Sequence, residues 1–202
     1  MNTIQPLRAL PSETFAIDRG RAERAAAELL DALGVDLGAE ATSETPRRMV
    51  DVYAELLTTP TDLIPTTFPN DGEYDELVVA RQIPFHSLCE HHLLPFVGVA
   101  SIGYLPGERI IGLSKLARVV ELFARSLQVQ ERLTTDIARW LERELEPRGI
   151  GVVIEAEHMC MSLRGVQKPG ANTVTSALLG QVRDDPSTRQ EFLALAGGTS
   201  RG

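Results

Sequence analysis

All four histidines and both cysteines of this 202-residue chain lie in two short stretches, FHSLCEHH near the middle and EHMC towards the C-terminus. Their side chains bind soft metals and transfer protons, and the rest of the chain has none of them. We therefore expect the chain to fold so that the two stretches meet and form one site.

The composition is that of an ordinary globular domain, with 43% apolar and 24% charged residues. The apolar runs are too short to span a bilayer and the N-terminus lacks signal-peptide features, so we expect a cytoplasmic protein with no membrane partner. In that reducing compartment the cysteines should be thiols or metal ligands. The net charge of −8 argues against general nucleic-acid binding, so an anionic ligand needs a local cluster of cations.

The N-terminal part of the chain has helical periodicity. Apolar residues recur at helical spacing from about Asp18 to Leu33, and Gly34 follows as a C-terminal cap. Thr45 is predicted to cap a second helix with Pro46 at its first position, and prolines 60, 65 and 69 then break the chain. We expect residues 1–70 to form a helical extension and residues 71–202 to form the main domain.

From about Asp75 the pattern alternates as in a strand, and one face is predicted to carry Leu77, Val79, Arg81, Ile83 and Phe85. Strands are also predicted over 94–104, 109–111, GVVIEAEHMCMSLRG and TVTSALL. Two long helices, opening at Ser114 and near Gln130, lie between them, with Leu127 turned inward on the first, and DPSTRQEFLAL forms a short final helix. This order indicates an α+β fold, and alternation should place His158 and Cys160 side by side.

Cys89 and His92 are spaced so that both can reach one ion from a single turn, and Cys160 can supply a second thiolate. Three protein ligands leave a tetrahedral zinc one open position, as in a catalytic site. A fourth ligand, His91 or His158, would close the site and make the zinc structural. If both stay free, they can act as acid and base, or each can simply satisfy a hydrogen bond near the metal.

Ser114, Lys115 and Arg118 open the first long helix, where free backbone N–H groups and the helix dipole favour an anion. The alternative is that Ser114 is only an N-cap and the cations are solvated. Gln130 and Glu131 could likewise complement the dipole of the next helix or accept hydrogen bonds from a ligand. The sequence pattern leaves both questions open.

Six ordered blocks from about Thr45 to Leu193 resemble GTP cyclohydrolase I, namely CEHH, GYLPGERIIGLSKLARVVE, QVQERLT, EAEHMCM, RGVQK and TVTSALLG. The resemblance implies the tunnelling fold, an antiparallel sheet backed by two long helices, with the sheets of several subunits closing into a barrel. It implies a homodecamer of two stacked pentamers. The implied reaction is zinc-dependent opening of the GTP imidazole ring at C8, with release of formate and formation of 7,8-dihydroneopterin triphosphate, the first step of folate or pterin biosynthesis.

The resemblance also implies roles for single residues. One zinc ion per subunit, held by Cys89, His92 and Cys160, would activate water, and His91 and His158 would transfer protons. Glu131, with Gln130 beside it, would accept from guanine N1–H and the exocyclic amine. The implied triphosphate contacts are Ser114, Lys115, Arg118 and Arg164, with Arg48 reaching a neighbouring subunit's site.

Two other functions share part of the pattern. A nucleotide-binding module with a structural zinc would need a closed four-ligand site, and a metal-independent deazapurine nitrile reductase of the same fold would use cysteine as a nucleophile. The H-x-E…P-C-x-x-C signature of the zinc deaminases is absent. His86 stands where we expect the family to have an aromatic ring, and it could pack like that ring, tune the site or compete for the metal.

Overall fold

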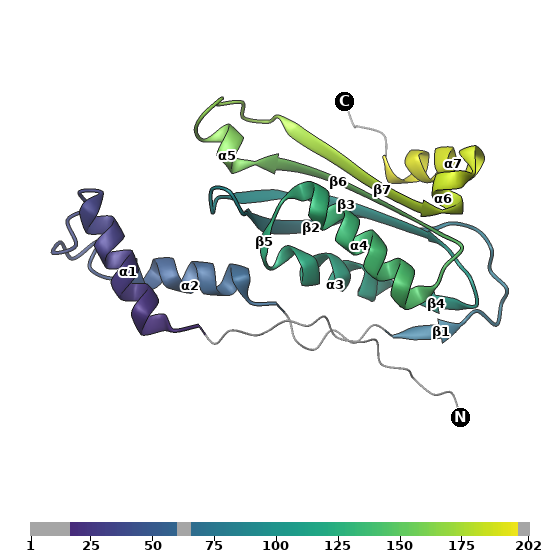
Figure 1. The fold of residues 1–202 in the computed structure, drawn as a ribbon, viewed down its shortest axis with the longest axis horizontal. Helices are drawn as coiled ribbons and strands as arrows, with labels where there is room; N and C mark the ends of the chain where they lie inside the picture. The colour runs from purple at the N-terminus through teal and green to yellow at the C-terminus, as the bar shows by residue number, and fades with distance from the viewer. Residues whose placement is uncertain (1–16, 60–65, 198–202) are drawn as a thin grey trace. The chain divides into compact units, whose positions relative to one another are not determined.

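The computed structural model describes residues 17–59 and 66–197, and these fall into two units, 17–58 and 59–197. The first unit consists of the helices α1 (Arg19–Ala32) and α2 (Thr45–Leu57). The second contains the strands and the remaining helices (Figure 1). Within the described ranges, no helix is both long and apolar enough to cross a membrane.

In the first unit, α1 begins and ends as predicted. Asp18 caps it by accepting a hydrogen bond from the Arg21 N–H at 3.0 Å, and Gly34 follows its last turn with φ +83°. The start of α2 differs from the prediction, because Thr45 is already helical and Glu44 is the N-cap, with no side-chain capping bond. An ion pair between Arg19 and Asp51 joins the two helices.

The second unit is built on a five-stranded sheet. Its strands lie in the order β5 (Leu127–Gln128), β2 (Val78–Cys89), β3 (Pro95–Leu105), β6 (Gly149–His158) and β7 (Asn172–Gly180). Neighbouring strands are antiparallel except that β5 joins β2 in parallel at Leu88 and Cys89. Two short strands, β1 (Thr67–Pro69) and β4 (Arg109–Ile111), pair separately, so Pro69 ends a strand.

Two long helices, α3 (Leu113–Ala124) and α4 (Gln130–Leu145), cover one face of the sheet (Figure 1). Their apolar stripes are buried as predicted, apart from Leu127, which lies in β5 and is 40% exposed. The predicted α+β fold, an antiparallel sheet backed by two long helices, is thus confirmed. Gly112 is the N-cap of α3, so Ser114 does not cap the helix.

The predicted face of β2 is wrong because the strand contains an irregularity. The pairing register with β3 shifts between Ala80 and Ile83, where Gln82 has φ +58°. An extra residue in one strand moves all later side chains to the opposite faces. Val79 therefore packs on the side away from α3 and α4, while Phe85 lies on the helix-covered side and meets the Phe96 ring edge-on at 5.9 Å.

Two C-terminal helices, α6 (Gln181–Asp184) and α7 (Pro186–Ala196), pack on the second face of the sheet. Asp185 caps α7, as the sequence allowed, by accepting from the Thr188 N–H at 2.8 Å. The core of this layer is the fully buried Phe192, whose ring lies against the backbones of Gly103 and Gly151. These helices contact the end of the sheet that lies away from the histidines and cysteines.

Candidate metal centre

The first stretch of the site is a tight turn at the end of β2. The Cys89 carbonyl accepts from the N–H groups of His92 at 3.3 Å and Leu93 at 2.9 Å, and the Cys89 N–H donates to the Leu94 carbonyl. Leu93 closes the turn with φ +54°. The turn brings the His92 ring back over the strand end, with its Nδ1 3.8 Å from the buried Cys89 Sγ.

The second stretch approaches the first from β6. Val152, Ile154, Ala156 and His158 share the helix-covered face, as predicted. The strand ends at His158, however, and the helical turn α5 (Met159–Ser162) carries Cys160, so the predicted strand geometry of Cys160 is wrong. This turn still places Cys160 so that ligand atoms of Cys89, His92 and Cys160 all lie within 4.8 Å of one another.

This cluster fits a soft divalent metal. Burial raises the pKa of the Cys160 thiol and the neighbouring Cys89 raises it further, so a bound cation would be needed to favour the thiolate form of Cys160. Two thiolates and one imidazole are ligands that zinc accepts. Over the described ranges, neither His91 nor His158 joins the three-residue group as a fourth ligand.

His158 is held beside the cluster by two contacts. Its ring stacks on Phe96, with centroids 4.7 Å apart and an interplanar angle of 5°. Its Nε2 lies 2.8 Å from the Gln130 Oε1. Burial lowers the pKa of His158, which favours the neutral ring, and the Glu131 carboxylate opposes this effect.

A cavity of about 240 Å³ opens at these residues. The start of α4 forms one side of it, with the exposed Glu131 in the first helical turn, and the metal cluster forms another. His91 also lines it, largely exposed, with Nε2 3.8 Å from Glu90 Oε1. Gln130 also lines the cavity, although the residue is only 1% exposed. The cavity therefore offers imidazole, carboxylate and thiol groups together.

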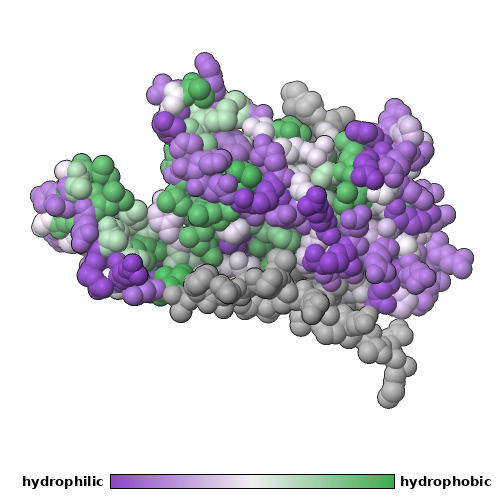
Figure 2. Space-filling model, in the orientation of Figure 1, coloured by the Kyte–Doolittle hydropathy of each residue, from purple (hydrophilic) through white to green (hydrophobic). Residues whose placement is uncertain are grey.

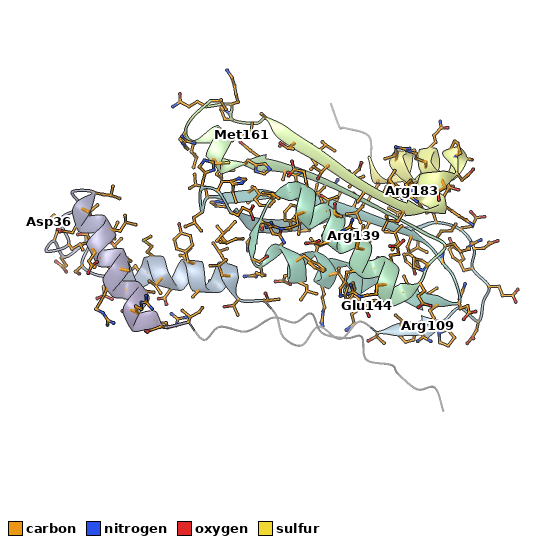
Figure 3. The ribbon with its side chains drawn as sticks, in the orientation of Figure 1. Asp36, Arg109, Arg139, Glu144, Met161 and Arg183 are labelled. Atoms are coloured by element: carbon orange, nitrogen blue, oxygen red, sulfur yellow. The ribbon has the colours of Figure 1, made fainter. Side chains whose placement is uncertain are left out.

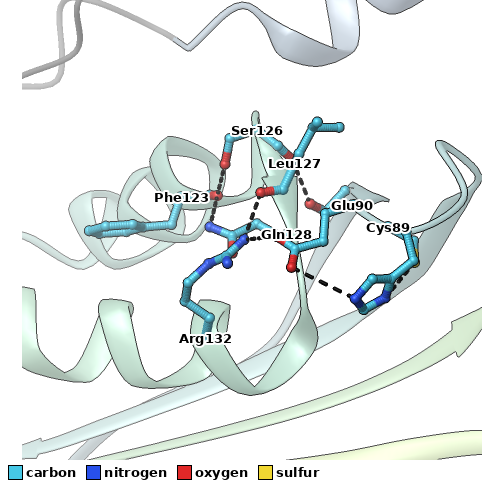
Figure 4. Close-up of polar contacts among 9 residues, drawn as sticks. Cys89, Glu90, Phe123, Ser126, Leu127, Gln128 and Arg132 are labelled. Carbon is cyan, nitrogen blue, oxygen red and sulfur yellow. Dashed lines mark hydrogen bonds and ion pairs between the residues drawn. The ribbon is translucent and has the colours of Figure 1, made fainter.

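A polar network around Arg132, which the sequence pattern did not indicate, holds the turn that carries Cys89 and His92 (Figure 4). Arg132 donates to Glu90, to the Leu127 carbonyl at 2.9 Å and to Gln128 Oε1 at 2.9 Å. Gln128 in turn donates to the Phe123 carbonyl at 3.1 Å. These bonds tie the turn to β5 and to the ends of α3 and α4. The only sequence signal is the four-residue separation of Gln128 and Arg132, although Gln128 lies in β5 and not in α4.

The loop after α5 is anchored by Glu157, which accepts from Ser162 and from the Gly170 N–H at 2.9 Å. Both bonds lower the pKa of the Glu157 carboxyl. Arg164 in this loop lies 3.4 Å from His92 Nε2, beside the metal cluster. Leu163 and Val166 are 67% and 62% exposed, and hydrophobic surface is visible around α5 in Figure 2.

The predicted anion contacts on α3 lie elsewhere in the second unit. Ser114 precedes Ala124 by ten residues of α3, about 15 Å at a helical rise of 1.5 Å per residue. It is the end of α3 that approaches β2 near Cys89, since the Ser87 hydroxyl donates to the Ser126 carbonyl. Figure 3 shows the same separation, because Arg109, just before α3, and Met161, next to Cys160, lie toward opposite ends of the sheet.

Arg118 lines a second cavity of about 300 Å³ between α3 and the edge of β2. His86 lines the same cavity. It is exposed and paired with Val97 on β3, three residues before Cys89 and so on the opposite face of the sheet. His86 is not part of the metal cluster. Arg48, the remaining predicted contact, is an exposed residue of α2 in the other unit.

Comparison with known proteins agrees with the resemblance seen in the sequence. Residues 22–197 match the family model of GTP cyclohydrolase I. The GTP cyclohydrolase 1 of Streptomyces avermitilis is 53% identical over 184 residues, covering 88% of this chain and 90% of the relative. That of Mycobacteroides abscessus is 51% identical over 184 residues, covering 88% and 89%. The chain belongs to the GTP cyclohydrolase I family.

Proposed function

We propose that this protein is a zinc-dependent GTP cyclohydrolase that opens the guanine imidazole ring of GTP at C8, releases formate and forms 7,8-dihydroneopterin triphosphate. The single observation that carries the proposal is the Cys89, His92 and Cys160 cluster in one cavity with His158 and Glu131. In a chain of this family, that cavity combines a metal position, a proton-transfer group and a guanine acceptor. The product would enter folate or pterin biosynthesis, in the cytoplasm.

The proposed metal is one zinc ion per subunit, held by Cys89, His92 and Cys160. With three protein ligands, the site keeps a position for substrate or water, as catalytic zinc sites do. When bound, zinc supplies Lewis-acid activation of water for attack on the ring. The absence of His91 and His158 from the ligand group supports this catalytic arrangement over a closed structural site.

Glu131 is proposed to accept hydrogen bonds from guanine N1–H and the exocyclic amine. It stands in the first turn of α4, where backbone N–H groups have no helical partner. Guanine presents the O6 acceptor next to the N1–H and N2–H donors, so the helix start and the carboxylate complement it. Adenine offers no such donor pair and would leave the carboxylate poorly matched.

Proton transfer is assigned to His158 and His91. His158 is the better placed of the two, because stacking and a hydrogen bond fix its ring at the cavity wall. His91 is exposed beside Glu90 and can exchange protons with solvent. Together they would protonate the purine nitrogen and accept a proton from the attacking water.

The proposed triphosphate contacts are Arg164, Ser114, Lys115 and Arg118. Arg48 is proposed to reach the site of a neighbouring subunit. Of the candidates within the second unit, only Arg164 lies beside the metal cluster of its own chain. We therefore propose that Ser114, Lys115 and Arg118 serve the site of a neighbouring subunit, in a homodecamer of two pentamers. Both sheet edges can support such an assembly, since in the described part of the chain β7 pairs only with β6, and the outer edge of β2 pairs only at Leu88 and Cys89.

The activity is tested by incubating purified, zinc-loaded protein with GTP and measuring formate and dihydroneopterin triphosphate. Production of both is expected. If the assembled protein binds zinc and nucleotide but forms neither product, it is a structural-zinc binding module. If it contains no metal and instead reduces a deazapurine nitrile, it belongs with the cysteine-dependent reductases.

The shared site has its own test by subunit complementation. Cys160→Ala removes a proposed metal ligand, and Arg118→Ala removes a proposed phosphate contact. Unfolding and reassembling the two variants together should restore activity that neither has alone, because some sites then combine an intact metal half with an intact cationic half. Mixtures as inactive as the separate variants would place both halves in one subunit's site.

A further inference from the structure

The side chain of Gln130 has four polar partners and is buried at the wall of the cavity. Its Nε2 lies 3.1 Å from the Ile154 carbonyl, 2.9 Å from the Thr173 carbonyl and 3.1 Å from Thr175 Oγ1. Its Oε1 lies 2.8 Å from His158 Nε2. Gln130 thus joins the start of α4 to β6, β7 and the histidine.

The orientation of the Gln130 amide follows from these partners. Two of them are carbonyl oxygens, which only accept, so the amide NH₂ must face them. Reversing the amide would place its oxygen against both carbonyl oxygens, with no hydrogen between them. The oxygen of Gln130 must therefore point at His158.

The threonine contacts agree with this orientation. Thr134 donates to the Gln130 carbonyl at 2.7 Å, so in its 2.7 Å contact with Thr175 it accepts and Thr175 donates. The Thr175 oxygen is then free to accept from the Gln130 NH₂. In this arrangement the hydroxyl groups of Thr134 and Thr175 and the NH₂ group of Gln130 each have an acceptor other than His158.

We propose that Gln130 is a positioning residue that keeps His158 in the tautomer with the proton on Nε2, so that Nδ1 is the nitrogen that exchanges protons in the reaction. An amide oxygen only accepts, so Nε2 must donate to it. Nδ1 then carries the lone pair, and no described residue makes a hydrogen bond to it. A proton accepted at Nδ1 gives the imidazolium and leaves from the same atom, while the Nε2 proton stays in place.

This inference rests on the proposed function and changes one part of it. The resemblance placed Gln130 beside Glu131 as a substrate contact. A side chain that is 1% exposed, with both polar atoms engaged, has no group left for guanine. Its effect on catalysis would act through His158, as outer hydrogen-bond partners act on metal-ligating histidines.

Two measurements test the proposal. In zinc-loaded protein labelled with ¹⁵N-histidine, solid-state NMR at a pH where the rings are neutral should show His158 with a proton on Nε2 and none on Nδ1. The His158 signals are assigned by their absence in His158→Gln. A proton on Nδ1 would overturn the proposal, whether or not the protein turns over GTP.

The kinetic test compares Gln130→Met with Thr175→Val, which removes one partner of the Gln130 NH₂ but keeps the contact to His158. Gln130→Met should lower kcat about 10–100-fold with little change in KM for GTP. Thr175→Val should keep kcat and KM for GTP near the wild-type values. A raised KM with unchanged kcat would make Gln130 a guanine contact, and an equal loss of kcat in Thr175→Val would make the network merely structural.

The two hypotheses fail in different ways. A wild-type protein that forms no product from GTP contradicts the proposed function, and the NMR result can still be obtained. If Gln130→Met does not fold, the NMR spectrum of the wild-type protein still decides the tautomer.

Discussion

The packing of Phe192 on two glycines gives a sharp prediction about the core. A Cβ added at Gly151 would lie 2.4 Å from Cε1 and 2.5 Å from Cζ of the Phe192 ring. Phe192 is 0% exposed, so its ring has no room to move away. Gly151→Ala should therefore lower the free energy of unfolding by about 1–3 kcal/mol through overpacking. Phe192→Ala should cost about 3–5 kcal/mol, since it leaves a cavity against the sheet.

The two changes should compensate when combined, because the Gly151→Ala methyl group would enter the space that the ring leaves. The double variant should cost about 1–3 kcal/mol less than the sum of the single variants. Gly72→Ala is the matched control, since no atom lies within 4 Å of its added Cβ, and it should change stability by less than about 0.5 kcal/mol.

Denaturant unfolding followed by circular dichroism, at one fixed protein concentration, measures all four variants. Zinc binding below the unfolding transition should be unchanged, because Gly151 precedes His158 by seven strand residues, about 23 Å at 3.3 Å per residue. The packing argument would be refuted if the effects of Gly151→Ala and Phe192→Ala on the free energy of unfolding were strictly additive. It would also be refuted if the Gly151→Ala variant were as stable as Gly72→Ala.

The site gives three further predictions. Cys160→Ala should lose zinc, measured by metal analysis, whereas His158→Ala should keep zinc and lose about 10²–10⁴-fold in kcat; loss of zinc from both would contradict the assigned roles. Glu131→Gln should raise KM for GTP about tenfold or more, because an amide NH₂ would then face guanine donors, and an unchanged KM would exclude guanine contact. The pKa of Glu157 is lowered from its ordinary value of 4.5, so its stabilising effect is present above that pH and is lost as pH falls through the folded-state pKa. Melting temperatures across acid pH should therefore converge for wild type and Glu157→Gln, and parallel curves would contradict this.

The sequence predicted the parts of the fold that depend on regular periodicity. The buried stripe of α4 from Leu133 to Leu145 follows from its 3.6-residue repeat, and the face of β6 from Val152 to His158 follows from alternation. It failed where one residue interrupts the repeat. The irregularity before Ile83 reverses the faces of β2, and nothing in the alternating pattern marks it.

The grouping of Cys89, His92 and Cys160 was predictable because two of the three residues are close together in the sequence. Cys89 and His92 lie within one turn, and cysteine and histidine are rare enough in this chain to identify their partner Cys160. The burial of Gln130 was not predictable, since a buried glutamine and one that binds a ligand look alike in a sequence. Only the three acceptors around its NH₂ group fix the direction of its oxygen.

The metal-ligand candidates and the predicted phosphate contacts on α3 lie in different parts of the second unit. The metal cluster and His158 lie at the ends of β2 and β6, where the ladder of the sheet and the Arg132 network hold them within a few ångströms. Arg118 lies on the exposed side of α3, next to the open edge of β2, where a second chain can approach. If the metal cluster and His158 of one subunit work with Arg118 of another, turnover would depend on assembly of the subunits. In the proposed homodecamer, a single subunit could bind zinc without being able to hold the triphosphate for the reaction.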